Sequence, residues 1–236
     1  KGSTDFWVIK IDQAGTFEWQ KSFGGTGADV ATDVVQAKDG GYVVVGNTNS
    51  QDGDINAFLH GNVEYWVLKL DDTGRIDWQR ILGGTGNDYP TAVELVDNGY
   101  LISGYSASKD GDVKNGYHTS GNDAWIVKLD EAGTLLWEKS VGGTGNDMGY
   151  SVHSTSDGGC IVAGRTQSSD GDIWNPNGGI DMFVAKLMPV PADSVVVSVQ
   201  GGGTPDITTA GGMLQLEAVV YPAGLSQDVN WTIVPV

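Results

Sequence analysis

Short apolar runs alternate with glycine-containing turns along residues 1–187 of the chain. One run in each unit is almost wholly apolar, as in Tyr42–Val45, which is typical of a strand covered on both faces. A mixed run, Val30–Ala37, precedes it across an Asp-Gly turn, a dipeptide that favours a tight hairpin because both residues adopt positive φ. Two more runs, Phe6–Ile11 and Thr16–Phe23, flank Gly15 and predict a second hairpin. No apolar stripe of helical period accompanies them, so the pattern predicts strands only.

The whole pattern repeats with a period of about 59 residues. Two aromatic positions recur at this spacing: Trp7, Trp66, Trp125 and Phe183 in one column, and Trp19, Trp78 and Trp137 in the other. The motif Gly-Gly-Thr-Gly-x-Asp recurs at Gly24–Asp29, Gly83–Asp88 and Gly142–Asp147. Self-similarity at a fixed period is the sequence signature of repeat architectures. The chain therefore predicts about three copies of a four-strand unit within residues 1–187.

Four short strands per repeat, joined by glycine-rich crossings, are typical of the blade of a β-propeller. We therefore predict an all-β fold in which blade-like sheets stack face to face and the two tryptophan columns fill the space between them. Burying one large side chain contributes about 1.5–3 kcal/mol, so these columns would anchor each contact between blades. A closed ring needs at least about four blades, so the predicted ring is incomplete. A parallel β-solenoid is the structural alternative, although its repeat lacks two close hairpins per period.

The motifs WVIKID-x-x-G-x-x-x-W, KSFGGTG-x-D, DGGYVVVG and S-x-DGD resemble repeats of bacterial secreted and surface proteins, notably those of Bacteroidetes and some Firmicutes. The resemblance covers residues 5–187 and implies a propeller built from these units. It implies no particular activity, because that family has no uniform function and no catalytic motif to carry over.

Residues 195–236 follow a different pattern. The stretch ITTAGG-x-LQLEAVVYPA and the later pair Asn230–Trp231 resemble the first half of a bacterial Ig-like domain of group 2. About half of a typical ~80–100-residue Ig-like β-sandwich is covered, so a partial domain is predicted. Residues 188–194, with the sequence MPVPADS, form the predicted linker, because Pro189 and Pro191 interrupt any strand ladder.

Acidic residues number 30 against 13 Lys and Arg, which gives the chain a net charge of −17. Such a surface repels nucleic acid and anionic membranes and suits an extracellular or cell-surface protein, although solubility alone is the simpler explanation. No run of 18 apolar residues occurs, so we expect no membrane insertion. The single cysteine, Cys160, cannot form an intrachain disulfide, and we expect it at a buried strand start as inert packing.

An Asp-Gly-Asp triplet recurs in each copy and is the best metal candidate. Two carboxylates separated by glycine offer oxygens to Ca²⁺, and backbone carbonyls would complete the shell. The triplet does not match the twelve-residue EF-hand loop, which needs a distal Glu. The simpler interpretation is a turn in which each Asp accepts backbone N–H groups, and no cofactor is then required. The six candidate ligands are Asp52, Asp54, Asp110, Asp112, Asp170 and Asp172.

The loop after each triplet varies between copies, and variable loops on a constant scaffold are where binding specificity tends to lie. A Trp or Tyr ring in such a loop suits stacking on a sugar. Two histidines at the same offset would suit zinc, but a third ligand is missing and the predicted blades separate them. Packing of the loop residues on a neighbouring blade is an equally simple alternative. The candidate binding residues are Phe58, His60, Tyr117, His118 and Trp174.

These observations favour a non-enzymatic binding or adhesion scaffold at the cell surface, with glycans or proteins as partners. Most acidic residues occupy repeated positions, whereas a catalytic pair of carboxylates is needed only once. The GGTG motif is not a phosphate loop, because no Gly-Lys-Ser/Thr follows it. Two alternatives stay open. One is an accessory domain of a larger secreted enzyme, and the other is a structural module of a surface filament or secretion assembly in which other chains complete the propeller.

Overall fold

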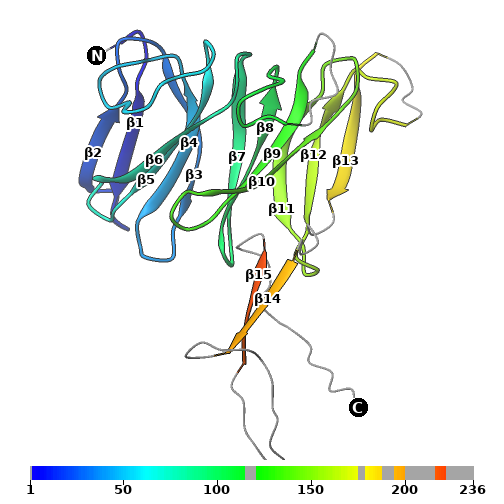
Figure 1. The fold of residues 1–236 in the computed structure, drawn as a ribbon. Helices are drawn as coiled ribbons and strands as arrows, with labels where there is room; N and C mark the ends of the chain where they lie inside the picture. The colour runs from blue at the N-terminus through cyan, green and yellow to red at the C-terminus, as the bar shows by residue number, and fades with distance from the viewer. Residues whose placement is uncertain (1, 115–120, 175–178, 188–193, 200–215, 222–236) are drawn as a thin grey trace, which may run out of the picture.

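A computed structural model describes residues 2–114, 121–174, 179–187, 194–199 and 216–221. Every regular element in these residues is a β-strand, and the strands gather into separate antiparallel sheets (Figure 1). This part of the chain holds no helix with the length and apolarity needed to cross a membrane. The strands are β1 (Phe6–Ile11), β2 (Phe17–Phe23), β3 (Asp29–Gln36), β4 (Tyr42–Thr48), β5 (Glu64–Leu70), β6 (Ile76–Leu82), β7 (Asp88–Val96), β8 (Gly99–Ser106), β9 (Asp123–Leu129), β10 (Leu135–Val141), β11 (Met148–Ser154), β12 (Cys160–Thr166), β13 (Asp181–Leu187), β14 (Ser194–Val199) and β15 (Leu216–Tyr221).

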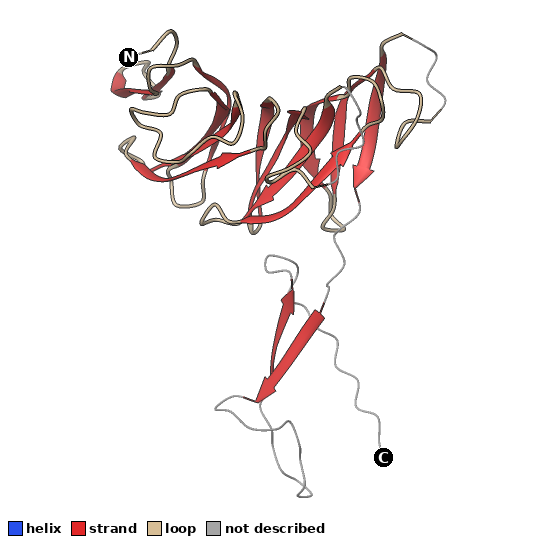
Figure 2. Cartoon of the chain, turned by 45° about the horizontal axis from the view of Figure 1, so that its top comes forward, coloured by secondary structure: helices blue, strands red, loops and turns tan. Residues whose placement is uncertain are grey.

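Two sheets have four strands each and follow the chain as up-and-down meanders, β3-β4-β5-β6 and β7-β8-β9-β10. The hairpin β1-β2 precedes them, and a three-stranded sheet, β11-β12-β13, follows them. Figure 1 shows these sheets side by side in chain order, and Figure 2 shows that within the described ranges they do not close into a ring. The predicted all-β fold of blade-like units in an incomplete ring is therefore confirmed. A β-solenoid is excluded because each unit is a separate sheet.

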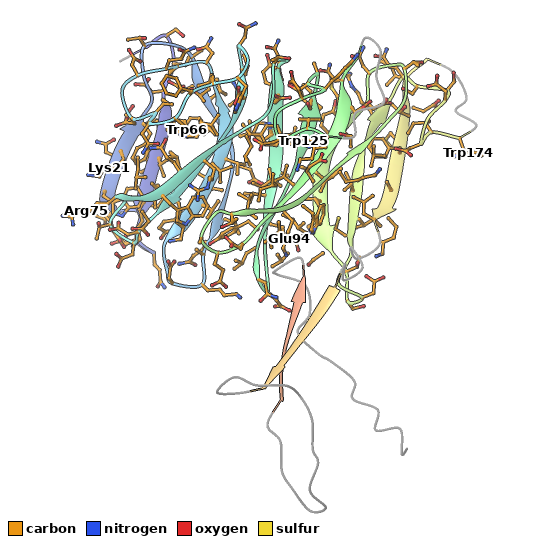
Figure 3. The ribbon with its side chains drawn as sticks, viewed as in Figure 1. Lys21, Trp66, Arg75, Glu94, Trp125 and Trp174 are labelled. Atoms are coloured by element: carbon orange, nitrogen blue, oxygen red, sulfur yellow. The ribbon has the colours of Figure 1, made fainter. Side chains whose placement is uncertain are left out.

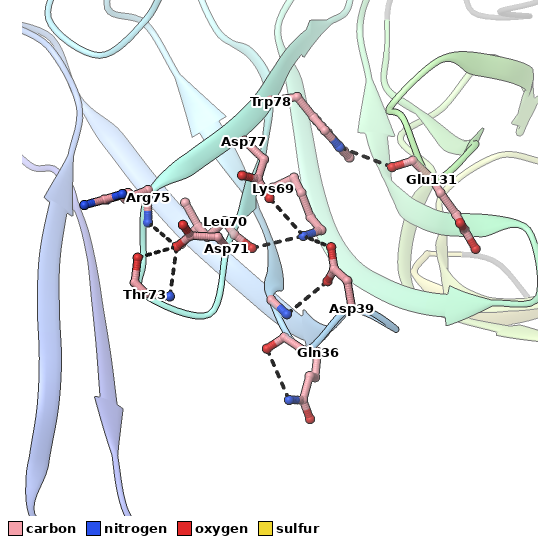
Figure 4. Close-up of polar contacts among 12 residues, drawn as sticks. Gln36, Asp39, Lys69, Leu70, Asp71, Thr73, Arg75, Asp77, Trp78 and Glu131 are labelled. Atoms are coloured by element: carbon pink, nitrogen blue, oxygen red, sulfur yellow. Dashed lines mark hydrogen bonds and ion pairs between the residues drawn. The ribbon is translucent and has the colours of Figure 1, made fainter.

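An aspartate and a glycine close the hairpin between the third and fourth strands of a unit. In the sheet β3–β6, the Asp71 carboxylate accepts hydrogen bonds from the backbone N–H groups of Thr73 and Arg75, both at 2.8 Å (Figure 4). The bond from Arg75 is the main cause that holds the pKa of the Asp71 carboxyl below its usual value. Gly74 adopts a φ of 78°, which a residue with a side chain rarely does. The predicted glycine turn therefore forms here with added support from the aspartate.

The inner strands of the central sheets are covered on both faces. All seven residues of β5 are buried, because neighbouring sheets lie on either side of it (Figure 3). The strands β4 and β8, which were predicted from continuous apolar runs, are buried along most of their length. The interpretation of these runs as two-sided buried strands is therefore confirmed for β4 and β8. It is wrong for the third run, Cys160–Ala163 in β12, where burial alternates and Ile161 is 37% exposed.

Aromatic pairs join the first three sheets. Phe6 of β1 packs against Trp66 of β5, and Tyr65 of β5 packs against Trp125 of β9. The ring centroids are 4.7 Å apart in both pairs. Trp66 and Trp125 are fully buried, so the first predicted tryptophan column does fill the space between sheets. At Trp7 the same position is 64% exposed, because no sheet precedes β1 in the described part of the chain.

The second tryptophan column reaches the hairpin turn of the following sheet. Trp19 Nε1 donates a hydrogen bond to the backbone carbonyl of Asp72 at 2.9 Å. Trp78 Nε1 donates to the carbonyl of Glu131 at 3.2 Å (Figure 4). An indole that is apolar on its face and hydrogen-bonded at its edge fixes direction as well as contact. These bonds therefore help to set how the first three sheets lie against one another.

The strands β14 and β15 form a separate two-stranded antiparallel sheet, with Ser194 opposite Tyr221 and Val199 opposite Leu216. The predicted linker, residues 188–194, lies outside the described residues except for Ser194. The partial Ig-like domain and the division of the chain into residues 1–187, 188–194 and 195–236 therefore stay predictions.

Candidate functional site

The glycine-rich motif and the aspartate triplet of each unit meet at one end of the sheets. The motif joins the last strand of one sheet to the first strand of the next, and the triplet follows the second strand of that next sheet (Figure 1). We call each meeting point a connector loop. The three connector loops are residues 24–29 with 52–54, 83–88 with 110–112, and 142–147 with 170–172.

In the first connector loop, the triplet carboxylates hold the backbone of the glycine-rich motif. Asp52 accepts the backbone N–H of Thr26 at 2.7 Å on Oδ1 and the Thr26 hydroxyl at 3.0 Å on Oδ2. Asp54 Oδ2 accepts the N–H of Gly24 at 3.0 Å. Gly53 has a φ of 72°, and an added Cβ there would collide with the Gly24 carbonyl oxygen. The two aspartates of the triplet are therefore explained by the backbone N–H groups that they accept, and the glycine by the close approach of the Gly24 carbonyl.

The other two connector loops repeat these contacts. The equivalent pairs are Asp110 with Thr85, Asp112 with Gly83, Asp170 with Thr144 and Asp172 with Gly142. The bond from the Thr85 N–H is the main cause that lowers the pKa of the Asp110 carboxyl. Among the described residues, no group of three or more His, Cys, Asp or Glu side chains is placed to hold a metal ion. Calcium binding by the triplets stays a prediction.

A buried aspartate stands at the centre of each connector loop. Asp88 is fully buried, and its Oδ2 accepts the N–H of Gly84 at 3.0 Å and the hydroxyl of Ser108 at 2.9 Å. Its Oδ1 accepts the hydroxyl of Ser106. Burial raises the pKa of the Asp88 carboxyl, and the Ser106 hydroxyl opposes that shift. This carboxylate therefore satisfies three donors that the loop would otherwise bury without a partner.

The hydroxyl partners of these buried aspartates form a motif that the sequence analysis missed. The motif reads Ser/Thr-x-Ser and occurs at Thr48–Ser50, Ser106–Ser108 and Thr166–Ser168. Its spacing follows the repeat, and this periodicity was the signal that would have revealed it. The aspartates that it serves are Asp29, Asp88 and Asp147.

His60 is bound to a buried carboxylate at the base of its loop, a contact that the sequence analysis also missed. The backbone N–H groups of His60 and Gly61 both donate to Glu64 Oε1, the latter at 2.7 Å. His60 Nδ1 lies 3.5 Å from Glu64 Oε2, which makes an ion pair when the imidazole is protonated. Glu64 is fully buried at the start of β5, whereas the His60 side chain is 56% exposed. His60 therefore anchors the β4–β5 loop while its ring stays open to solvent.

Two predicted binding residues are almost completely exposed aromatics. Phe58 in the β4–β5 loop is 90% exposed, and Trp174 in the β12–β13 loop is 85% exposed. Figure 3 shows Trp174 at the outer end of the stacked sheets, whereas Phe58 belongs to the loop of a different sheet. The two side chains therefore do not share one site. Tyr117 and His118 lie outside the described residues.

A cavity of about 360 Å³ opens beside Trp174 on the last sheet. Its wall includes Asp172 from the triplet, Met182 and Val184 from β13, and Val141 from β10. An aromatic ring next to a carboxylate and apolar side chains suits a ligand with one apolar face and several hydroxyl groups.

Cys160 begins β12 and is 1% exposed. Burial raises the pKa of its thiol to about 11, so the reactive thiolate is scarce at neutral pH. The expectation of a buried packing residue at a strand start is confirmed.

The fold and these loops define an all-β repeat protein whose sheets carry clamped connector loops and exposed aromatic side chains at one end. Neither a protein-family model nor a curated protein matches this chain.

Proposed function

We propose that this chain is an extracellular, non-enzymatic scaffold that binds glycan or protein partners through the loops after its aspartate triplets. The observation that carries this proposal is that an aspartate triplet held by hydrogen bonds is followed, a few residues along the chain, by an aromatic side chain exposed to solvent. Asp170 is hydrogen-bonded to the backbone of Thr144, and Trp174, four positions further along the chain, is 85% exposed. Phe58, six positions after Asp52 of the first triplet, is 90% exposed, and Asp52 is hydrogen-bonded to the backbone of Thr26.

Binding favours such an arrangement because a pre-organised loop loses little conformational entropy when a partner arrives. An exposed aromatic ring supplies a large contact area with few rotatable bonds, and its face stacks well on a sugar ring or an apolar side chain. The cavity beside Trp174 adds the Asp172 carboxylate as an acceptor for ligand hydroxyl groups. The β12–β13 loop is therefore the first place to look for a ligand.

Two further observations support a position outside the cell. The net charge of −17 disfavours nucleic acid and anionic membranes as partners. The repeats resemble those of bacterial secreted surface proteins, and residues 195–236 resemble an Ig-like module that would act as a spacer. Adhesion at a cell surface is the role that combines these features.

A broad glycan and protein array, probed with the labelled chain, tests this function. We expect at least one glycan or protein ligand, and we expect Trp174→Ala combined with Phe58→Ala to weaken its binding about tenfold or more, as for an aromatic hot spot. Phe17→Ala is the matched control, because Phe17 is 65% exposed but lies at the β1–β2 hairpin, away from the connector loops.

An array with no ligand, or a ligand insensitive to the double variant, would overturn the proposal. The same array is run with Ca²⁺ and with a chelator, because the triplet carboxylates are the predicted calcium ligands. If the ligand still binds in the presence of the chelator, ligand binding does not require Ca²⁺. If binding is lost, the result supports calcium sites at the triplets.

A structural role in a surface assembly is the second candidate function. It is favoured by the large apolar side chains that are exposed on the first and last sheets, among them Trp7 and Met182. These side chains belong to the strands β1 and β13 and form surfaces that a partner chain could cover, although Met182 also lines the cavity beside Trp174.

A further inference from the structure

The first sheet exposes a face that the central sheets bury. We call this the tryptophan face, and on β1 it consists of Trp7, Ile9 and Ile11. Their exposed fractions are 64%, 36% and 56%. The equivalent side chains of the central sheets, which face the preceding sheet, are all 0% exposed: Trp66, Leu68 and Leu70 on β5, and Trp125, Val127 and Leu129 on β9.

The last sheet exposes the opposite face, which we call the forward face. On β13 it consists of Met182 and Val184, which are 91% and 68% exposed. The equivalent side chains of the central sheets, which face the following sheet, are again 0% exposed: Tyr65 and Val67 on β5, and Ala124 and Ile126 on β9.

These two exposed faces are the two halves of one type of contact. Inside the molecule, the forward face of one sheet always meets the tryptophan face of the next, as in the pairs Phe6–Trp66 and Tyr65–Trp125. The tryptophan face of β1 is also held in its binding shape, because Trp7 Nε1 donates to Gln20 at 3.3 Å as Trp66 Nε1 donates to Gln79 at 3.1 Å. One chain therefore carries both halves of a contact that it already makes between its own sheets.

We infer that a second copy of this chain docks head to tail, with the tryptophan face of its β1 on the forward face of β13 in the first copy. The predicted stagger is that of the internal contacts, so Trp7 of the second copy packs against Met182. A contact between two different faces does not close on itself as a two-fold dimer does, so copies add at either end. This interaction needs no ligand in the loops, although Met182 and Val184 of the forward face also line the cavity beside Trp174, so a docked copy would cover part of that cavity.

A second copy fits both faces better than an unrelated partner does. Each face matches, position by position, a surface that the same chain already covers with its own side chains. Any other partner would have to supply one of these two surfaces, whereas a copy supplies both. Large apolar side chains on one side of a sheet, in a chain whose other sheets bury them, are the pattern expected of an interaction surface.

Sedimentation velocity on the full chain from about 1 to 200 µM tests this inference, a range that spans the weak affinity expected of a small interface. We expect the wild-type chain to form a series of species that grows with concentration. Trp7→Glu removes the tryptophan face and Met182→Glu removes the forward face, so each variant alone should be monomeric. Phe58→Glu is the control, because Phe58 is 90% exposed but belongs to neither face, and it should associate as the wild type does.

Mixing the two monomeric variants gives the sharpest outcome. Trp7→Glu keeps an intact forward face and Met182→Glu keeps an intact tryptophan face, so an equimolar mixture should form a dimer and stop there. Ile9→Glu with Val184→Glu repeats the test if either first variant lacks the far-ultraviolet circular dichroism of the wild type. A wild-type chain that stays monomeric throughout, variants that associate unchanged, or a mixture that stays monomeric would each overturn the inference.

Discussion

Trp125→Ala should lower the free energy of unfolding by about 3–5 kcal/mol, the range for removing a large aromatic side chain from a packed core. Trp125 is fully buried between two sheets and packs against Tyr65 with the rings tilted at a centroid distance of 4.7 Å. Its indole also donates to Glu138 at 2.9 Å. Alanine would leave a cavity in the contact that joins the two central sheets. Urea denaturation followed by far-ultraviolet circular dichroism, on dilute protein, measures the loss.

Trp7→Ala is the matched control for this variant. It removes the same side chain from the same position of the repeat, with the equivalent hydrogen bond to Gln20. Because Trp7 is 64% exposed, we expect a loss of about 1 kcal/mol or less. Equal losses for the two variants would contradict the stacked arrangement, since they would mean that both positions have the same surroundings.

Asp88→Ala should lower the free energy of unfolding by about 2–4 kcal/mol. The change leaves the hydroxyls of Ser106 and Ser108 and the N–H of Gly84 without their acceptor, and a buried donor without a partner costs about 1–3 kcal/mol. Two effects reduce the sum. The hydroxyls can rotate to other acceptors, and the variant no longer buries a carboxylate whose pKa is raised by desolvation.

The control for Asp88→Ala is Asp71→Ala. Asp71 also accepts several hydrogen bonds at a turn, but its donors Thr73 and Arg75 are exposed and water replaces the lost acceptor. The same urea experiment should therefore give a clearly smaller loss for Asp71→Ala. If the two variants lost the same stability, the buried aspartate would not be the centre of the connector loop.

The arrangement of strands was predictable because its determinants are local and repeated. The strands and turns follow from signals that depend on only a few neighbouring residues. These signals are the turn dipeptides, the spacing of glycines such as Gly74, and continuous apolar runs such as β4. The recurrence of the tryptophans also made it possible to predict that each sheet packs face to face on the next. The residues that pack against Trp66 and Trp125 were harder to predict. Their position in the repeat holds an aromatic residue in Phe6 and Tyr65 but an alanine in Ala124.

The connector loops were only partly predictable. The triplets were recognised as acceptors of N–H groups, but their donors lie in the glycine-rich motif, across two strands, as Thr26 does for Asp52. No local pattern links two such segments. The Ser/Thr-x-Ser partners of the buried aspartates escaped notice because small polar residues are common in loops. The contact between His60 and Glu64 escaped notice because it lies in the loop whose sequence varies between copies.

Solvent accessibility of three equivalent tryptophans tests the stacking of repeated sheets most directly. Hydroxyl-radical oxidation of the chain at about 1 µM, below the concentrations at which copies should meet, is read by mass spectrometry for each tryptophan. Trp7 should be oxidised rapidly, whereas Trp66 and Trp125 should be protected until the chain unfolds. Similar oxidation rates at all three positions in the folded chain would contradict the burial of this column between sheets.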